Sequence, residues 1–204
     1  FAGWQMPIQF EGLIYEHNSV RNNAGIFDIS HMGVFSITGI NPKDSLQNLV
    51  PSDLHRIGPG EACYTVLLNE DGGIIDDLII YDLGVEPNNT HSLLIVINAA
   101  CIEKDISWLQ KNLNSKKIQI EDAKKDGVLI ALQGPKSINQ LNLILEKPIP
   151  DIPRFGHRQM QIKIHDNDNN FSMFIARTGY TGEDGFEILL EKEGGIAIWN
   201  KLIK

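Results

Sequence analysis

The sequence predicts an α+β protein in which antiparallel sheets are flanked by helices. Short apolar runs alternate with polar residues, which is the pattern of half-buried strands. Turn residues, chiefly Gly, Asn, Asp and Pro, separate these runs. A few longer segments carry apolar residues at helical spacing, so we expect helices between the strands.

The first part of the chain follows a β-α-β-β-β-α-β-β order, from about residue 35 to residue 132. Ahead of it, residues 6–21 are mixed in character and indicate a loop, while residues 24–40 alternate as a single strand would. Pro42 suits the first turn of a short helix. The remaining expected elements are a helix over 44–50, hairpin strands over 64–68 and 72–81, a strand over 93–100, a helix over 101–114, and strands over 117–121 and 128–132.

Residues 133–135, Gln-Gly-Pro, end this layer, and Pro135 again suits a first helical turn. The expected elements after it are a helix carrying Ile138, Leu141, Ile144 and Leu145, strands over 159–165, 171–177 and 186–191, and a helix over 196–203. The last helix lacks a stop signal and the chain starts at Phe1, so we expect a piece of a larger protein.

Charge and composition narrow the class of protein. The 204 residues are 42% hydrophobic and 22% charged, which is ordinary for a globular chain with a substantial core. The net charge of -8 argues against nucleic acid or an anionic membrane as the main partner. No apolar run is long enough to cross a bilayer, so we expect a soluble, intracellular protein.

Cysteine and histidine give no sign of a disulfide framework or a metal centre. Cys63 and Cys101 are the only cysteines, and both lie next to apolar segments, so we expect buried thiols. The six histidines are scattered without the spacing of metal ligands. No metal site is predicted.

Two carboxylates, Asp76 and Asp77, interrupt the second strand of the predicted hairpin. Burying a carboxylate is costly unless something compensates its charge. Side chains alternate along a strand, so Asp77 and Tyr81 share one face while Asp76 lies on the other. Pairing within the hairpin would bring Tyr64 to the face of Asp77. Such a surface would suit a flat ligand that carries amine groups.

A structural role for this acidic pair stays open. Either Asp76 or Asp77 could cap a turn or pair with a lysine or arginine elsewhere in the chain. Their position midway along an apolar strand, beyond the reach of its own turn, favours a functional site.

A second polar constellation, R-T-G-Y-T-G-E-D-G-F-E, occupies residues 177–187 between two predicted strands. Its glycines permit positive φ and let a ligand approach the backbone. A tight surface loop would have the same composition, so that alternative stays open. Glu187 differs because it lies within the following strand, where its carboxylate could accept paired hydrogen bonds from a ring N–H and an amino group.

A third cluster contains Asp28, Ser30 and His31, the residue types of a hydrolase triad. The three lie within four residues, where alternation separates Ser30 from His31, and the chain holds no G-x-S-x-G elbow. We therefore expect structural contacts here, with Met32 as a soft packing surface.

Six motifs follow one another along the chain: F-A-G-W-x-M-P (1–7), G-I-F-D-I-S-H-M-G (25–33), G-G-I-I-D-D-L-I-I-Y (72–81), N-A-A-C-I-E-K-D (98–105), Q-G-P (133–135) and R-T-G-Y-T-G-E-D-G-F-E (177–187). In this order and spacing they resemble the aminomethyltransferase (T-protein) family of the glycine cleavage system, from Phe1 to Lys204. The resemblance implies a folate-binding protein of three domains. This chain would hold the first, residues 1–34 with 135–204, and the second, residues 35–134, but not the C-terminal β-barrel.

The resemblance also implies an activity. In that family an aminomethyl-derived one-carbon unit passes from lipoylated H-protein to tetrahydrofolate, giving 5,10-methylenetetrahydrofolate and ammonia. The catalytic aspartate corresponds to Asp77. The residues that the resemblance places in contact with folate are Met32, Tyr64, Tyr81, Asn98, Tyr180 and Glu187. Tetrahydrofolate would be the cosubstrate and H-protein the partner, in a bacterial cytoplasm or an organellar matrix.

Relatives of the same fold keep two other functions open. Folate-dependent demethylases differ in the carbon donor, and a folate-binding protein linked to iron–sulfur assembly performs no such transfer. The acidic residue at Asp77 argues against the second. Arginines that help to hold folate in the family would lie beyond Lys204, so this chain alone would bind folate weakly or be inactive.

Overall fold

The structure, a computed structural model, describes residues 1–86, 89–113 and 118–204 and divides into two compact units. The first unit holds Gly3–His31 and Asp126–Lys204, and the second holds Met32–Lys125; Phe1 groups with the first and Ala2 with the second. Within the described residues each unit is built on a five-stranded antiparallel sheet with helices packed on it. The predicted α+β class is therefore confirmed.

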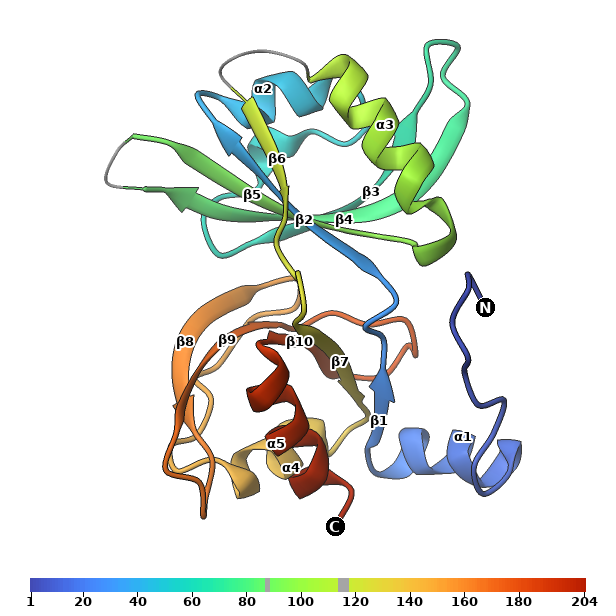
Figure 1. Cartoon of the computed structure of the whole chain (residues 1–204), viewed down its shortest axis with the longest axis vertical. Helices are drawn as coiled ribbons and strands as arrows, with labels where there is room; N and C mark the ends of the chain where they lie inside the picture. Colours follow the sequence, from blue (N-terminus) through green and yellow to red (C-terminus); the bar gives the residue numbers. More distant parts are fainter. Residues whose placement is uncertain (87–88, 114–117) are drawn as a thin grey trace. The chain divides into compact units, whose positions relative to one another are not determined.

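The sheet of the first unit combines strands from distant parts of the chain (Figure 1). Its strands, in spatial order, are β1 (Gly25–Asp28), β7 (Val128–Gln133), β10 (Gly185–Leu190), β9 (Asn170–Ala176) and β8 (His157–Lys163). β1 pairs with β7 although the whole second unit lies between them in sequence. The second unit is thus inserted into the first.

Helices α4 (Ser137–Ile144) and α5 (Lys192–Leu202) pack on this sheet and close its core. Leu141 and Ile198 are fully buried in the same cluster as Ile188 of β10. α5 comes so close to β7 that a Cβ on Gly195 would overlap the side chain of Val128. Packing therefore requires a glycine at this helical position, despite the poor helix propensity of glycine.

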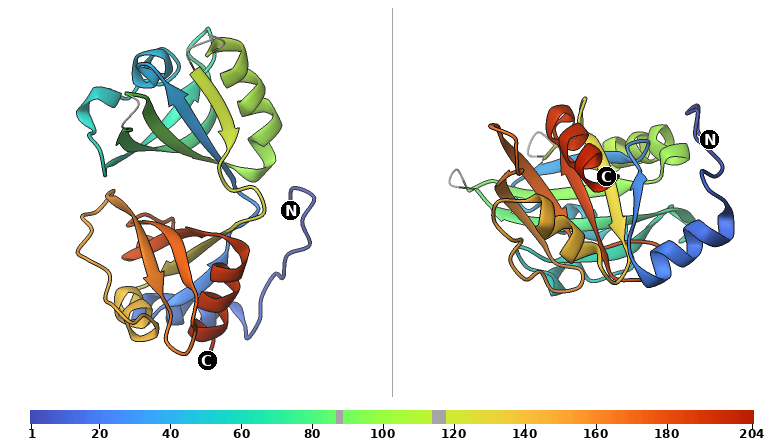
Figure 2. Two further views of the ribbon diagram at one scale, coloured as in Figure 1. Left: turned by 60° about the vertical axis from the view of Figure 1, so that its left-hand side comes forward. Right: turned by 90° about the horizontal axis from the view of Figure 1, so that it is seen from below.

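The second unit also consists of a sheet with helices packed on it (Figure 2). Its strands, in spatial order, are β3 (Ala62–Leu68), β4 (Ile74–Val85), β5 (His91–Ile97), β2 (Gly33–Gly39) and β6 (Ile118–Asp122). The helical elements are α2 (Pro42–Gln47), η1 (Leu54–Arg56), η2 (Ala99–Cys101) and α3 (Ile102–Asn112). Leu46 of α2 and Leu109 of α3 are buried with Ile80 and Ile95, so both helices cover the same core.

The turn between β3 and β4 explains why the predicted hairpin forms. Asn69 Oδ1 accepts the N–H groups of Asp71 at 3.0 Å and Gly73 at 2.7 Å, and Asn69 N–H donates to the Gly73 carbonyl at 2.8 Å. Gly72 has a φ of 78°, which glycine adopts without strain. This turn fixes the register of the two strands.

The stretch predicted as one strand over residues 24–40 is two strands in two different sheets. β1 ends at Asp28 and β2 begins at Gly33. Between them Ser30 Oγ accepts the Leu129 N–H at 3.1 Å and lies 3.3 Å from the Leu129 carbonyl oxygen. Ser30 therefore makes a structural contact, as expected. Alternation indicates an extended chain, but it does not reveal a change of sheet.

The unit boundary also differs from the predicted division at residues 34 and 134. β7 pairs with β1 and β10, so residues 126–134 belong to the first unit and not to the second. An apolar run predicts a strand, but its partners are far away in sequence. The run alone could not assign β7 to a sheet.

Residues 13–22 form helix α1 (Leu13–Asn22), where the sequence indicated a loop. Glu16 accepts the N–H groups of Phe10 and Glu11 at 2.8 Å and of Gly12 at 3.0 Å, and these bonds lower the pKa of its carboxyl. α1 contains no buried residue. Six of its last seven residues are polar, so its sequence gives only a weak apolar pattern.

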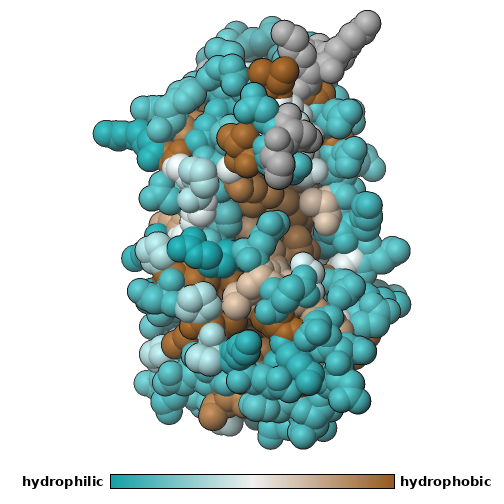
Figure 3. Space-filling model, turned by 90° about the vertical axis from the view of Figure 1, so that its left-hand side faces the viewer, coloured by the Kyte–Doolittle hydropathy of each residue, from teal (hydrophilic) through white to brown (hydrophobic). Residues whose placement is uncertain are grey.

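Cys63 and Cys101 are free thiols and are half-buried, so they are less enclosed than expected. Hydrophilic residues cover most of the face seen in Figure 3, as a net charge of -8 would lead one to expect. In the described ranges, every helix is too short or too polar to cross a membrane.

Candidate functional site

Asp77 lies near the start of β4 in the second unit, on the sheet face opposite to the helices' core. Val66 of β3 is its cross-strand partner, and Tyr64 lies two residues further along the same face. The Tyr64 hydroxyl donates to Asp77 Oδ2 at 3.1 Å. This hydrogen bond, together with burial and the nearby carboxylates, raises the pKa of Tyr64. The predicted meeting of Tyr64 and Asp77 is confirmed.

Asn98, the residue that follows β5, holds Asp76 and Asp77 together. Its Nδ2 lies 3.1 Å from Asp77 Oδ1, 3.2 Å from the Asp77 carbonyl oxygen, and 3.1 and 3.2 Å from the two carboxylate oxygens of Asp76. An amide has two N–H donors, so these four acceptors share them. Asn98 therefore fixes the orientation of the Asp77 carboxylate from one side, as Tyr64 does from the other.

The strand register extends this group by one residue. Ile97 pairs with Gly33 of β2 and with Leu78 of β4, so one step onward Met32 and Asp77 flank Asn98. Met32 is half-buried there. Tyr81 shares the face of Asp77, as predicted, but it is only 1% exposed. Tyr64 is 52% exposed.

Asp105 of α3 is a member of this neighbourhood that the sequence analysis missed. Its side chain is 1% exposed, and burial and the neighbouring carboxyl of Asp76 raise its pKa to about 7. A signal existed, because Asp105 lies three residues after Ile102 and four before Leu109, on the apolar stripe of the helix. A carboxyl group on such a stripe is buried when the helix docks.

In the first unit, Glu187 occupies the middle of β10 and is 5% exposed. The Thr178 hydroxyl donates to Glu187 Oε2 at 2.6 Å. Gln133 Nε2 in turn donates to the carbonyls of Thr178 at 3.0 Å and Phe186 at 3.3 Å. A Cβ on Gly179 would overlap the Gln133 side chain, so this glycine permits the close approach.

The glycine-rich loop around Tyr180 is anchored at its two ends. Arg177 Nε and Nη2 each donate to an Asp184 carboxylate oxygen at 2.8 Å, and this paired bond holds the pKa of Asp184 below its usual range. Arg21 of α1 pairs with Glu183 at 2.8 Å. Tyr180, predicted to contact folate, is 66% exposed between these anchors. Its ring is open to a ligand.

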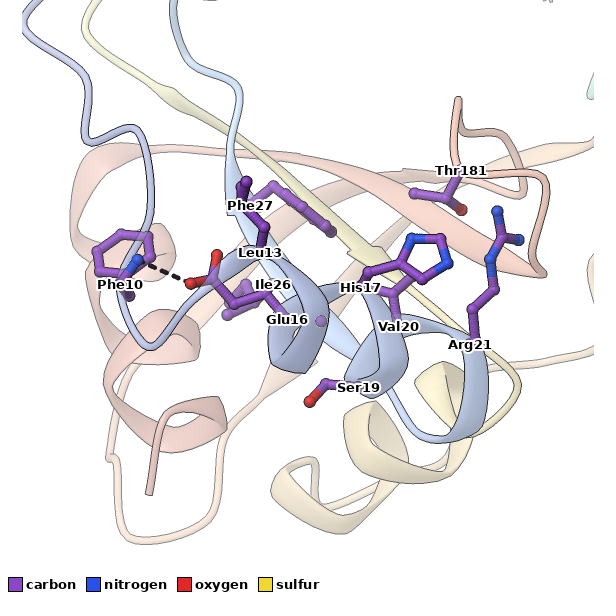
Figure 4. Close-up of a pocket in the computed structure, with 11 residues that line it drawn as sticks. Phe10, Leu13, Glu16, His17, Ser19, Val20, Arg21, Ile26, Phe27 and Thr181 are labelled. Atoms are coloured by element: carbon purple, nitrogen blue, oxygen red, sulfur yellow. Dashed lines mark hydrogen bonds between the residues drawn. The ribbon is translucent and has the colours of Figure 1, made fainter.

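A cavity of about 410 Å³ lies beside this loop within the first unit (Figure 4). Its walls come from α1, β1 and the loop, and they are mostly apolar. The lining residues labelled in the close-up are Phe10, Leu13, Glu16, His17, Ser19, Val20, Arg21, Ile26, Phe27 and Thr181. Sequence reasoning missed this cavity because it had placed no helix over residues 13–22. Across the ranges that the structure describes, no three His, Cys, Asp or Glu side chains cluster as metal ligands would.

Comparison with known proteins identifies the family to which this chain belongs. A family model described as the GCVT N-terminal domain matches residues 1–204. The chain belongs to the GCVT N-terminal domain family. Among the curated relatives of this family member are aminomethyltransferases from Prochlorococcus marinus strain SARG, 64% identical over 205 residues, and from Synechococcus sp. strain CC9902, 56% identical over 204 residues. Each comparison covers 100% of this chain and 55% of the relative.

A solved structure of an aminomethyltransferase agrees with the GCVT assignment. The glycine cleavage system aminomethyltransferase T from Bartonella henselae is 33% identical, with a TM-score of 0.82 over 100% of this chain and 52% of that one. A heterotetrameric sarcosine oxidase from Corynebacterium sp. U-96 has a TM-score of 0.54 at 13% identity over 93% of this chain and 88% of that one, which shows a shared fold alone. The chain spans about half the length of the curated relatives it matches.

Proposed function

We propose that this chain is part of a tetrahydrofolate-dependent aminomethyltransferase of the glycine cleavage system. The protein would transfer the aminomethyl-derived one-carbon unit from lipoylated H-protein to tetrahydrofolate, with release of ammonia and formation of 5,10-methylenetetrahydrofolate. The proposal rests on membership of the GCVT N-terminal domain family and on relatives that bear the name aminomethyltransferase. The single observation of the structure that carries it is the fixed carboxylate of Asp77.

The chemistry explains why a fixed carboxylate is useful. The carbon being transferred gains cationic character as its bond to the donor weakens, so a negative group held at the right place stabilises that state. Tyr64 and Asn98 hold Asp77 before any ligand arrives, so little reorganisation is needed during the reaction. Asp77 would also orient the nitrogen that attacks the carbon. Tetrahydrofolate, when bound, supplies that nitrogen nucleophile.

The chain has side chains of the kinds that a folate requires. A pterin ring is flat and presents N–H and amino donors along one edge, so it calls for an acceptor carboxylate and for aromatic or sulfur surfaces. Glu187 provides the carboxylate, and the exposed rings of Tyr64 and Tyr180 provide surfaces for stacking. Met32 and Asn98 complete the proposed folate contacts. Tyr81, which shares the face of Asp77, belongs to the same proposed set, with 1% of its surface exposed.

The proposed partner is the lipoylated H-protein, and the proposed location is the cytoplasm of a bacterium, because the relatives named above are cyanobacterial. A folate-dependent demethylase or a non-catalytic folate-binding protein of the same fold would differ in what happens at Asp77. A demethylase would use another carbon donor. A binding protein would not need the carboxylate to be held in one orientation.

Ammonia release from aminomethyl-loaded H-protein tests the proposal, with the whole protein assayed with and without tetrahydrofolate. Asp77→Asn is expected to lower turnover by about 100-fold or more, since it removes the charge but keeps the size of the side chain. The dissociation constant for tetrahydrofolate should change by less than about threefold. Asp71→Asn, an exposed carboxylate in the turn of the same hairpin, is the matched control and should leave both quantities unchanged.

Three outcomes contradict parts of this assignment. Equal losses of turnover and folate affinity in Asp77→Asn would make Asp77 a binding residue and not a catalytic one. Folate binding by the unaltered protein without ammonia release would favour the demethylase or the non-catalytic protein. Ammonia release that does not depend on tetrahydrofolate would remove the folate from the reaction.

A further inference from the structure

Among the residues that the structure describes, the carboxyl groups of buried Asp105 and half-buried Asp76 form no ion pair with a lysine or arginine. Asp105 of α3 is 1% exposed, and among the described residues neither of its oxygens has a hydrogen-bond donor within reach. The ionisable group that influences it most is Asp76, which lies on the core-facing side of β4 with Leu78 and Ile80. A buried carboxylate without a donor would lose several kcal/mol of hydration, so such a group takes up a proton instead.

The charges that surround this pair point the same way. Lys104 directs its Nζ to the Ile75 carbonyl at 2.6 Å and offsets the negative charge of Asp105 only in part. Asp77 adds negative charge from the next position of β4. The Cys101 thiol also lies near Asp76, and burial and that carboxylate raise the pKa of the thiol. Carboxyl groups therefore outnumber the cations around Asp105.

Asp105 is therefore mainly a neutral acid below about pH 7. Burial raises the pKa of Asp105 to about 7, and its interaction with Asp76 contributes to the shift. A protonated carboxyl is a hydrogen-bond donor, and the carboxylate of Asp76 is the acceptor beside it. Two neighbouring carboxyl groups that share one proton carry one negative charge in place of two.

We propose that Asp105 is a positioning residue for the reaction, acting on Asp77 through Asp76 and Asn98. The Asp105 hydroxyl holds the Asp76 carboxylate in one orientation. Asp76 accepts from Asn98 Nδ2 at 3.1 and 3.2 Å, and the same amide donates to Asp77 Oδ1 at 3.1 Å. The shared proton also reduces the negative charge that faces Asp77. The inference rests on the proposed aminomethyl transfer for its effect on turnover, but not for its effect on Asn98.

Two substitutions separate positioning from packing. Asp105→Asn keeps the shape and retains an N–H donor for Asp76, whereas Asp105→Leu keeps a similar volume and removes the donor. In the whole protein, we expect Asp105→Leu to lower turnover by about 10- to 100-fold with tetrahydrofolate affinity within threefold, and Asp105→Asn to stay within about threefold in both. Glu103→Gln, an exposed residue of the same helix, is the control and should change neither.

The pH profile provides a readout that a structural role would not move. In the unaltered protein Asp105 loses its proton as the pH rises through about 7, so turnover should decline above that pH. Asp105→Asn cannot ionise and should lack that part of the decline. Full turnover in Asp105→Leu, or equal losses in Asp105→Leu and Asp105→Asn, would overturn the proposal.

A second measurement keeps the inference testable if the proposed function fails. The side-chain amide of Asn98 gives its own signals in a nitrogen–proton NMR spectrum of the unaltered protein. These signals should shift with a midpoint near pH 7, lose that pH dependence in Asp105→Asn, and change position in Asp105→Leu, where Asp76 has lost the donor from Asp105. Absence of ammonia release by the unaltered protein would remove the proposed function alone. Asn98 signals that ignore pH and both substitutions would remove the role of Asp105.

Discussion

Two aspartates of β4, Asp76 and Asp82, lie on the same face of the sheet but have different surroundings. Asp82, near the end of β4, is 1% exposed and pairs with Lys43 of α2 and, at 2.7 Å, with His91 of β5. Burial raises the pKa of Asp82, but the hydrogen bonds from Lys43 and His91 outweigh it and hold the pKa below its usual range. At the start of the strand, Asp76 interacts with Asp105 of α3, and within the described ranges neither carboxyl group has such an ion pair.

The difference separates a carboxylate that stabilises the fold from carboxyl groups that serve a site. Asp82 meets donors from two other elements, so its charge ties α2 and β5 to β4. Asp105 gains nothing comparable for the fold, and its raised pKa records an unfavourable environment for charge. Ionisable groups with strongly shifted pKa values are concentrated at functional sites.

The largest expected effect on stability comes from removing the carboxylate of Asp82, which pairs with Lys43 and His91. Asp82→Ala leaves Lys43, whose side chain is 11% exposed, without its carboxylate. Removing one partner of a buried ion pair costs about 3–5 kcal/mol, and urea unfolding of the protein measures the loss. The control is Asp44→Ala, because Asp44 and His55 form an exposed pair at 3.2 Å that should be worth about 0–1 kcal/mol. Equal losses in the two variants would contradict the distinction.

Measuring the free energy of unfolding at several pH values sharpens the comparison, because the contributions of Asp82 and Asp105 change in opposite directions with pH. The lowered pKa of Asp82 gives stability that is present above about pH 4 and is lost as the pH falls. The raised pKa of Asp105 gives stability that is present below about pH 4 and is lost as the pH rises through about 7. The free energy of unfolding of the unaltered protein, relative to Asp105→Asn, should therefore fall by roughly 1–3 kcal/mol between pH 5 and pH 8. A constant difference would show that Asp105 does not titrate in this range.

The smallest effect on stability is expected at Tyr64, whose exposed side chain donates to Asp77. Tyr64→Phe removes the hydroxyl that donates to Asp77, but the ring is 52% exposed, so water replaces the lost donor. Urea unfolding should show a loss of less than about 1 kcal/mol. A loss above about 2 kcal/mol would mean that the Tyr64 to Asp77 bond stabilises the fold itself, as the ion pair of Asp82 does.

What could be predicted from the sequence was set by local pattern. The turn at Asn69 and the alternation along β4 are local, so the meeting of Tyr64 with Asp77 followed from them. The strand position of Glu187 followed in the same way. The burial of Tyr81 could not be predicted, because it depends on what packs over a whole sheet face and not on the strand itself.

The remaining errors have a common physical origin in contacts between distant segments. β7 finds its partners in β1 and β10, and no local pattern in its apolar run names them. Asp105 was on a helix that was predicted, but its contact with Asp76 depends on how α3 docks on β4. In helix α1 six of the last seven residues are polar, so hydrophobic periodicity gave little sign of it.

The insertion of the second unit between β1 and β7 has a consequence for synthesis on the ribosome. β1 leaves the exit tunnel long before its partner, because residues 29–127 must be translated first. At about 5–20 residues per second the wait is roughly 5 to 20 seconds. During that interval the second unit is able to fold, while the nascent β1 has neither β7 nor β10 beside it. The connectivity of the chain therefore allows the inserted second unit to fold before the sheet of the first unit can be completed.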